Sequence, residues 1–333
     1  MKCTSAPAAV HAWLARRAGA PGSLSLAVTV ALFVALSLAG GIAYDGFLAP
    51  QVFLNLLIDN AFLLVVAVGM TFVILAGGID LSVGAVVAFT TVLHASLVQH
   101  HGWHPLGAAS LALLLGTGFG ATLGLVIQRY RLQPFVVTLA GMFLARGAAT
   151  LISVESIGID DAFQRAVAGM RIPLGGDTSL SVGAVTALGV VAVATLVARS
   201  TQFGRTVYAI GGSESSAALM GLPVFSTIVG VYAVSGFCAS LAGVLYTLYM
   251  LSGYSLHATG LELDAIAAVV IGGTLLSGGA GHVPGTLFGV LVLGLIQTLI
   301  SFNGTLSSWW TRIVIGMLLL VFCLLQRLLM RRS

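Results

Sequence analysis

Charged side chains are scarce in this sequence. Asp, Glu, Lys and Arg together make up 7% of its 333 residues, while hydrophobic residues make up 58%. Soluble domains carry about 25% charged residues. So few charges cannot form a water-facing surface, which excludes a soluble enzyme and a nucleic-acid-binding domain. The composition instead predicts an all-α polytopic membrane protein, because helices satisfy their own backbone groups in lipid.

Lysine is almost absent, since Lys2 is the only one. A P-loop requires a lysine next to Ser or Thr after a glycine-rich loop, so the chain has no nucleotide site of that kind. Any energy from ATP must therefore come from a partner subunit. The three cysteines, Cys3, Cys238 and Cys323, are too far apart for a metal-ligand or disulfide pattern. We expect no cofactor, no bound metal and no covalent chemistry.

Long apolar runs are what the sequence has in abundance. A membrane helix needs about 20 apolar residues. We predict about ten transmembrane helices, one of them short, within a single permease domain at 24–326, with cytoplasmic segments 1–23 and 327–333 on either side. The predicted helices cover residues 24–44, 53–75, 81–98, 106–128, 134–152, 179–198, 226–251, 264–276, 283–302 and 308–326.

Basic and acidic residues separate between the two sides of this topology. Because Lys and Arg concentrate in cytoplasmic loops, the separation predicts a multi-pass protein of the bacterial inner membrane with both termini in the cytoplasm. Two longer connections remain, an outer loop at 153–178 and a cytoplasmic stretch at 199–225. The basic clusters are Arg16 and Arg17, Arg129 and Arg131, Arg199 and Arg205, and Arg327, Arg331 and Arg332; the acids opposite are Asp45, Glu155, Asp160, Asp161, Asp177 and Glu262.

Two apolar segments are interrupted by similar motifs. "GGIDLS" at 77–82 recurs as "GGTLLS" at 272–277, with Gly-Gly, Leu and Ser in register. Interrupted segments in the two halves of a membrane protein indicate discontinuous helices at a substrate pathway. Polar residues near helix ends, such as Asn60 and Gln297, join the same set. The pathway candidates are Asn60, Gly77, Gly78, Asp80, Ser82, Gly272, Gly273, Ser277 and Gln297.

Asp80 has two compatible interpretations. A carboxylate at the centre of a membrane helix costs about 2.5 to 3.5 kcal/mol. Asp80 or Ser82 can cap the next helix, because both residue types are favoured at that position. Alternatively, Asp80 lines the pathway and meets sugar hydroxyls or water. Glu262 and Asp264 near an outer helix end are likewise either capping residues or contacts for a soluble partner.

The stretch 199–225 predicts a short helix at 213–221. Ser213 can cap it, Glu214 suits its first turn, and Gly221 with Pro223 ends it. Its apolar residues are Ala217, Leu219 and Met220. Such a helix either lies on the membrane surface or docks in the groove of a partner.

Three long motifs resemble one family in order along the chain. "TQFGRTVYAIGGSESSAALMGL" resembles the coupling segment of ABC importer permeases of the ribose, xylose and galactose group, and the "GGIDLS" and "GGTLLS" regions look like that family's other motifs. "IDNAF" and "NGTLSSWW" look most like galactofuranose importer permeases of that group. The resemblance implies an ATPase subunit, a second permease subunit and a periplasmic sugar-binding protein as partners. It implies coupling to the ATPase through Gly204, Ser213, Glu214, Ala217, Ala218 and Gly221.

The sequence therefore predicts a sugar permease that works by alternating access. An ion-coupled secondary sugar transporter is the first alternative, with Asp80 as its ion site. A membrane enzyme acting on lipid-linked sugar is the second, but its clustered acids or metal ligands are missing, since the ten acidic residues are dispersed.

Overall fold

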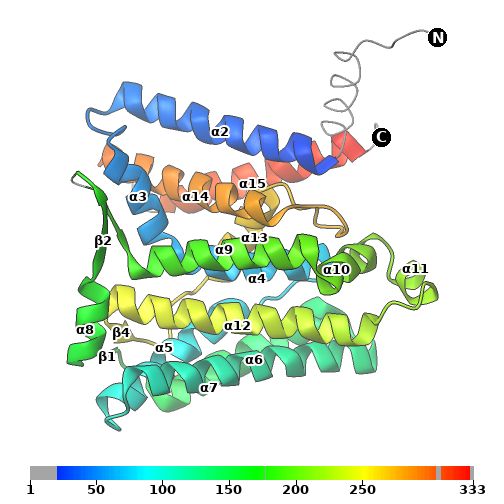
Figure 1. Cartoon of the computed structure of the whole chain (residues 1–333), viewed down its shortest axis with the longest axis horizontal. Coiled ribbons are helices and arrows are strands. Elements are labelled where there is room, and N and C mark those ends of the chain that lie inside the picture. Colours follow the sequence, from blue (N-terminus) through cyan, green and yellow to red (C-terminus); the bar gives the residue numbers. More distant parts are fainter. Residues whose placement is uncertain (1–20, 177, 305–308, 331–333) are drawn as a thin grey trace, which may run out of the picture.

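The computed structural model describes residues 21–176, 178–304 and 309–330 (Figure 1). Several predicted features fall wholly or partly outside these ranges: most of the N-terminal segment 1–23 with its Arg16 and Arg17, Asp177, residues 305–308 of the "NGTLSSWW" motif, and Arg331 and Arg332 of the tail. The described chain is a bundle of helices that run roughly along one direction (Figure 1).

The helices follow the predicted apolar runs closely. Each predicted range lies mainly over helix in the structure. The bounds are α2 (Pro21–Ala43), α3 (Pro50–Asp59), α4 (Ala61–Leu75), α5 (Val83–Gln99), α6 (Pro105–Tyr130), α7 (Pro134–Ile152), α9 (Val182–Ser200), α12 (Val224–Met250), α13 (Leu261–Ile271), α14 (Val283–Asn303) and α15 (Trp309–Met330).

The number of membrane spans differs from the predicted ten. Within the described residues, six helices are long and apolar enough to cross a membrane, or seven if a bent pair counts as one span. That pair is α3 and α4, which meet at an angle of 60°. The segment predicted at 53–75 is therefore not one straight helix. The helices α5 and α13 are shorter than a full span because the chain is interrupted beside each of them.

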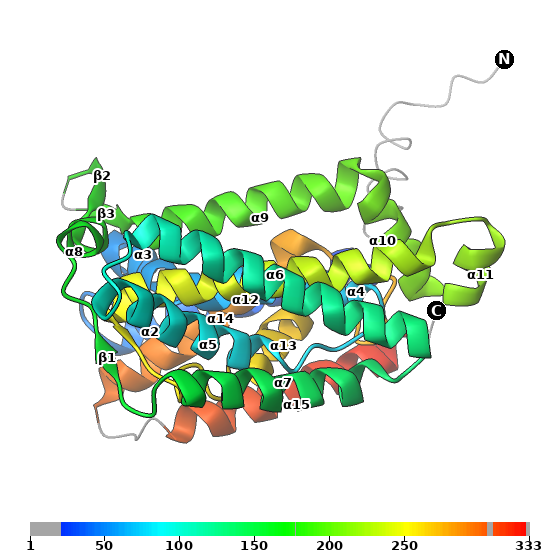
Figure 2. The ribbon, with the colours of Figure 1, turned by 90° about the horizontal axis from the view of Figure 1, so that it is seen from below.

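The two ends of the bundle carry different connections. At one end, called the hairpin end, β2 (Arg171–Gly175) pairs with β3 (Thr178–Ser181), and β1 (Ile157–Gly158) pairs with β4 (Ser252–Gly253) near α8 (Ala162–Gly169) (Figure 1). At the other, called the α11 end, α10 (Gln202–Gly212) leads to α11 (Glu214–Leu219), which projects beyond the bundle (Figure 2). No membrane is part of the structure, so the orientation stays a prediction.

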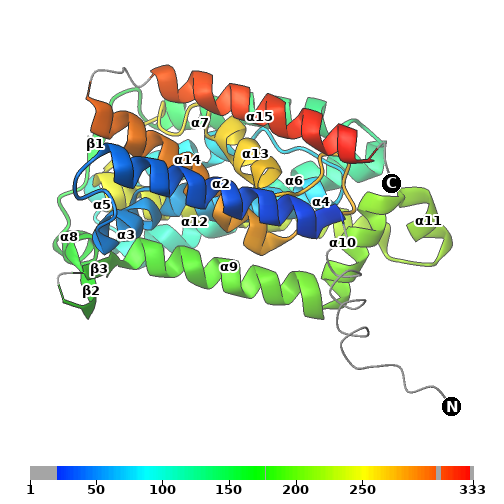
Figure 3. The same ribbon diagram turned by 90° about the horizontal axis from the view of Figure 1, so that it is seen from above.

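α6 packs closely on α12. A side chain at Gly120 would overlap the Tyr232 carbonyl oxygen, and one at Gly116 would lie 3.0 Å from the Gly236 carbonyl oxygen. The small residues repeated at 116, 120 and 124 therefore let the two backbones touch, as small-residue repeats do in membrane helices. On the opposite side, α2, α14 and α15 lie together along one face of the bundle (Figure 3).

Candidate functional site

The first interruption follows α4 and has the geometry of a Schellman motif. The Gly77 amide donates to the Ile74 carbonyl and the Gly78 amide donates to the Val73 carbonyl, both at 2.9 Å. Gly77 has φ +81°, a left-handed conformation that glycine adopts without a steric penalty. The glycine pair therefore ends α4 inside the bundle while its last carbonyls remain hydrogen-bonded.

The second interruption repeats this geometry one residue later than the sequence comparison predicted. The Gly273 amide donates to the Val270 carbonyl, the Thr274 amide donates to the Val269 carbonyl, and Gly273 has φ +94°. Gly77 is thus the structural equivalent of Gly273, not of Gly272. Gly272 instead lets α13 pack on α14, where its missing side chain leaves room for the Gly285 carbonyl.

The two interruptions meet in space although 195 residues separate Gly77 from Gly272. The Gly279 amide donates a 2.9 Å hydrogen bond to the Leu75 carbonyl at the end of α4. A side chain at Gly278 would lie 2.9 Å from the Gly77 nitrogen. One junction therefore joins the end of α4 to the connection that follows α13.

Asp80 is buried in this junction and fully hydrogen-bonded. Its Oδ1 accepts from the Ser82 amide at 2.9 Å and from the Ser82 hydroxyl at 2.6 Å, and its Oδ2 accepts from the Ser235 hydroxyl at 2.7 Å. Ser82 occupies the N-cap position of α5, but its side chain makes no capping bond to the helix. Asp80 thus ties the interruption to α12 and lies 1% exposed.

α10 packs directly against the junction, and this helix was not predicted. A side chain at Gly211 would overlap both the Leu75 carbonyl oxygen and the Gly279 nitrogen. The Tyr208 hydroxyl donates a 2.9 Å hydrogen bond to the Gly281 carbonyl. Burial raises the pKa of Tyr208, although Arg199 opposes the shift, so the hydroxyl stays a donor at physiological pH. Gly204, assigned to coupling by resemblance, allows the tight turn between α9 and α10.

α11 forms as the sequence predicts and presents an apolar tip. The Ser213 hydroxyl accepts from the Ser216 amide at 3.2 Å, and a third Schellman motif ends the helix at Gly221, whose φ is +74°. Leu219 is 90% exposed and Met220 is 67% exposed. Ala217, in contrast, is fully buried. Only Leu219 and Met220 of the three predicted apolar residues are therefore accessible to a partner, and Ala218 beside them is also exposed.

A cavity of about 220 Å³ lies between the first interruption and α11. Gly77 and Gly78 line one side of it, and Arg131 and Glu214 line the other. Arg131 Nη1 donates to Glu214 Oε1 at 2.7 Å, which connects α11 to the end of α6. Tyr232 also borders the cavity, and among the described residues its hydroxyl has no hydrogen-bond partner.

The remaining pathway candidates are dispersed. Asn60 is buried at the bend between α3 and α4, where its Nδ2 donates to the Leu56 carbonyl at 3.0 Å. Ser277 is exposed near the junction. Gln297 lies on the surface of α14, in a polar recess with Asp264 and Arg312. Their role in transport stays a prediction.

Glu262 and Asp264 lie in the first turn of α13, after the segment 251–260 that leads back from α12. Their role as capping residues or as contacts for a soluble partner stays a prediction. A side chain at Gly84 would overlap Glu262 Oε2, which is buried. Arg146 on α7 holds the returning segment by donating to the Ser255 and His257 carbonyls at 2.6 and 2.8 Å. Arg146 was itself the sequence signal for this contact, because a charged residue inside an apolar helix usually pairs with polar groups in the protein interior.

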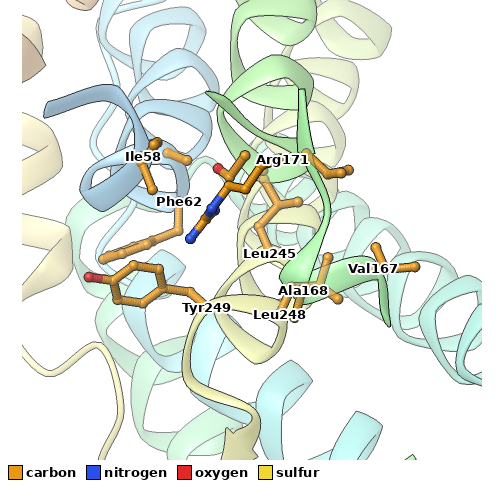
Figure 4. Close-up of a pocket in the computed structure, with 12 residues that line it drawn as sticks. Ile58, Phe62, Val167, Ala168, Arg171, Leu245, Leu248 and Tyr249 are labelled. Atoms are coloured by element: carbon orange, nitrogen blue, oxygen red, sulfur yellow. The ribbon is translucent and has the colours of Figure 1, made fainter. Parts of the chain in front are cut away.

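A second cavity, of about 130 Å³, opens at the hairpin end. Ile58, Ala61 and Phe62 of the "IDNAF" motif line it together with residues from α12 and β2. Figure 4 shows the Arg171 side chain pointing toward the rings of Phe62 and Tyr249. The Tyr249 hydroxyl donates to Asp59 Oδ1 at 3.1 Å, so the motif shapes one wall of this cavity.

Together, an apolar bundle, two interrupted helices that meet inside it and a capped helix at one end define a polytopic transport protein. The chain belongs to the family described as the permease component of branched-chain amino acid transport systems, which matches residues 52–323. It is thus a multi-pass membrane protein and a permease component of a transport system.

Three relatives show this kinship over most of their length. The chain is 49% identical to the inner membrane ABC transporter permease protein YjfF of Escherichia coli (strain K12), with 92% of both chains covered. It is 41% identical to the fructose import permease protein FruG of Bifidobacterium longum (strain NCC 2705), covering 90% of each. It is 35% identical to the ribose import permease protein RbsC of Escherichia coli (strain K12), covering 89% of this chain and 92% of the relative. No solved structure matches the chain.

Proposed function

We propose that this chain translocates a monosaccharide, galactofuranose, across the bacterial inner membrane as the permease subunit of an ATP-driven importer. The observation that carries the proposal is the junction in which α10, next to the exposed α11, touches the ends of both interrupted helices. A displacement of α11 would reach both broken spans through this single contact.

Coupling to an ATPase subunit is assigned to α11. Leu219 and Met220 expose apolar side chains at its tip, and an amphipathic helix docks such residues in a partner's groove. The chain supplies no P-loop lysine of its own. In this proposal, ATP-driven closure of the partner moves α11, and the Schellman turns at Gly77 and Gly273 act as hinges for alternating access.

The choice of sugar rests on sequence similarity. Permeases named for fructose and ribose import are 41% and 35% identical to this chain, which supports a monosaccharide as cargo. Galactofuranose is proposed from the "IDNAF" and "NGTLSSWW" segments. A second permease subunit and a periplasmic binding protein complete the proposed transporter, with the α11 end in the cytoplasm.

An ion-coupled mechanism is less well supported. Its ion site would be Asp80, but both carboxylate oxygens already accept hydrogen bonds from Ser82 and Ser235. Reconstitution separates the two mechanisms. The complex of permease subunits, ATPase and binding protein should hydrolyse ATP faster when galactofuranose-loaded binding protein is added, and uptake should persist with a protonophore.

Two results would contradict different parts of the proposal. A cognate binding protein that holds ribose and ignores galactofuranose would overturn the sugar. Uptake that stops with a protonophore while ATP is constant would overturn the transporter class. Coupling through α11 is tested by Ala218→Glu, which should abolish uptake while membrane insertion is retained; Ala218→Ser is the matched control. Uptake by Ala218→Glu at the wild-type rate would remove α11 from coupling.

A further inference from the structure

A polar recess interrupts the face formed by α13, α14 and α15. It encloses about 360 Å³ and is lined by Asp264, Gln297, Ser301, Thr311 and Arg312 together with two isoleucines. Asp264 on α13 and Arg312 on α15 both line it. Within the described part of the chain they form no direct ion pair, and the Gln297 side chain makes no hydrogen bond. Donors and acceptors therefore face a space that no described side chain fills.

The depth of the recess follows from the packing of α13 on α14. The missing side chains of Gly289 and Gly285 leave room for the Ala268 and Gly272 carbonyls, respectively. The two helices are therefore antiparallel. Asp264 lies one turn before Ala268 on α13, so it faces the position one turn after Gly289 on α14, which is about Leu293. Leu293 is the middle residue of α14, which spans Val283–Asn303. Asp264 thus lies near half the depth of a membrane-long helix. From there the recess extends to the end of the helices, because Ser301 lies two residues before α14 ends and Thr311 is the third residue of α15.

Away from the recess, the side chains exposed on the bundle are apolar, on α15 (Met317, Leu320 and Leu324) as on the other helices. The exposed large side chains in the middle of α6, α7 and α9 are Leu114, Leu115, Leu125, Phe143, Leu144, Val193 and Leu196. Exposed hydroxyls on these helices bond their own backbone, as Thr122 does to the Gly118 carbonyl, and Ser301 of the recess likewise donates to the Gln297 carbonyl at 3.0 Å. A charged side chain in contact with lipid is costly, and such residues face water-filled or protein-filled space. The recess around Asp264, unlike the apolar surface of α15 beside it, is therefore expected to hold water or protein and not lipid.

We propose that this recess binds the hydroxyl groups of the transported sugar on its way through the membrane. The inference rests on the proposed function and names the site within it. Asp264 accepts hydrogen bonds from sugar hydroxyls, Arg312 donates to sugar oxygens, and Gln297 can do both. The set is suited to a neutral polyhydroxylated ligand, because it pairs one negative with one positive group. Asp264 also lies on α13, the short helix that ends just before the hinge at Gly273, so the bound sugar lies about two turns from the second interruption.

Cysteine labelling tests whether the recess holds water without relying on transport. Gln297→Cys and Leu144→Cys are made in a background with Cys3→Ser and Cys323→Ser, and the complete reconstituted complex is treated with a charged methanethiosulfonate reagent. Because thiolates react only where water reaches them, we expect the cysteine at 297 to be labelled and the one at 144 to be spared. Sugar-loaded binding protein with ATP should slow the labelling at 297. Equal labelling at both positions, or none at 297, would overturn the proposal.

Uptake measurements test the ligand itself. Asp264→Leu removes an acceptor without adding a polar group to the membrane, and Thr311→Ala is compared with Thr122→Ala on α6. A lost hydrogen bond to a charged group corresponds to about 10-fold or more in rate, so Asp264→Leu should lower uptake at least about 10-fold at matched membrane expression. Thr311→Ala should lower uptake severalfold and Thr122→Ala should not.

The probes are galactofuranose, ribose and fructose, each tested with wild-type complex first. If the wild type takes up none of them, the proposed function fails, while the labelling result still decides whether the recess is water-filled. If the wild type takes up one of them and both Asp264→Leu and Thr311→Ala do so at the wild-type rate, the recess is not the sugar site and the proposed function stands.

Discussion

Tyr208 on α10 donates a 2.9 Å hydrogen bond to the Gly281 carbonyl, in the connection between α13 and α14. This bond joins the helix beside α11 to the second interruption of the bundle. On the same helix, Gly211 packs against the Leu75 carbonyl oxygen at the first interruption and against the Gly279 nitrogen in the connection after the second. A motion that begins at α11 therefore has a short, packed route to both hinges.

Replacing Gly211 with alanine should uncouple the transporter. The new methyl group would overlap the Leu75 carbonyl oxygen, and overpacking of this kind costs about 1 to 3 kcal/mol. Gly212→Ala is the matched control, because nothing lies within 4 Å of a side chain at that position. Uptake and binding-protein-stimulated ATP hydrolysis should fall in Gly211→Ala only. Wild-type uptake by this variant would show that the close contact is not needed.

Removing the Tyr208 hydroxyl should weaken coupling to a smaller extent. Tyr208→Phe keeps the ring and deletes a hydrogen bond that contributes about 0.5 to 1.5 kcal/mol. We expect more ATP hydrolysed per sugar transported, with normal expression. Because burial raises the pKa of this hydroxyl, its donor function is present at low pH and is lost only above the ordinary tyrosine range. The ratio of ATP hydrolysed to sugar transported in the wild type should therefore stay flat from about pH 6 to 9. An unchanged ratio in Tyr208→Phe would argue against this bond in coupling.

Reversing the charges of Arg131 and Glu214 should reveal an energetic link between α6 and α11. Both side chains are partly exposed, at 74% and 46%, so the pair contributes about 0 to 1 kcal/mol to stability. Each single reversal, Arg131→Glu or Glu214→Arg, should lower stimulated ATP hydrolysis, and the double reversal should restore part of it. A double-mutant cycle measures the interaction. Additive effects of the two changes would mean that the pair plays no part in coupling.

Asp80→Asn should preserve most transport and lower stability. The Asn side-chain oxygen can still accept a hydrogen bond from the Ser82 amide. The bond from the Ser235 hydroxyl, however, no longer goes to a negatively charged acceptor, and hydrogen bonds to a charged group contribute about 1.5 to 3 kcal/mol. Ser235→Ala should lower the melting temperature in the same direction. Thermal unfolding and uptake at matched expression are the measurements. A well-folded Asn variant with no uptake would assign the charge itself to transport and favour an ion site.

Much of the helical architecture could be predicted from the sequence, because a helix that crosses the lipid bilayer needs a long run of apolar residues. The cap at Ser213 and the stop at Gly221 were predicted correctly, since capping and Schellman termination depend on residues a few positions apart. α10 was missed because its glycines weaken helix propensity and because its apolar face becomes evident only when packed on the junction. The repeat was aligned one residue away from its structural register, because Gly272 and Gly273 are identical in sequence and differ in φ.

The amino-acid sequence by itself determined the class of protein, the lack of a P-loop lysine and the positions of its two interruptions, because each depends on composition or on local glycine and capping chemistry. Only the tertiary structure decided that the two interruptions meet, that α10 touches both, and that Asp80 is enclosed while Asp264 faces an open recess. These relationships join residues up to about two hundred positions apart, and the close approach of backbones at Gly211, Gly278 and Gly289 that creates them is set by helix packing, not by any local pattern.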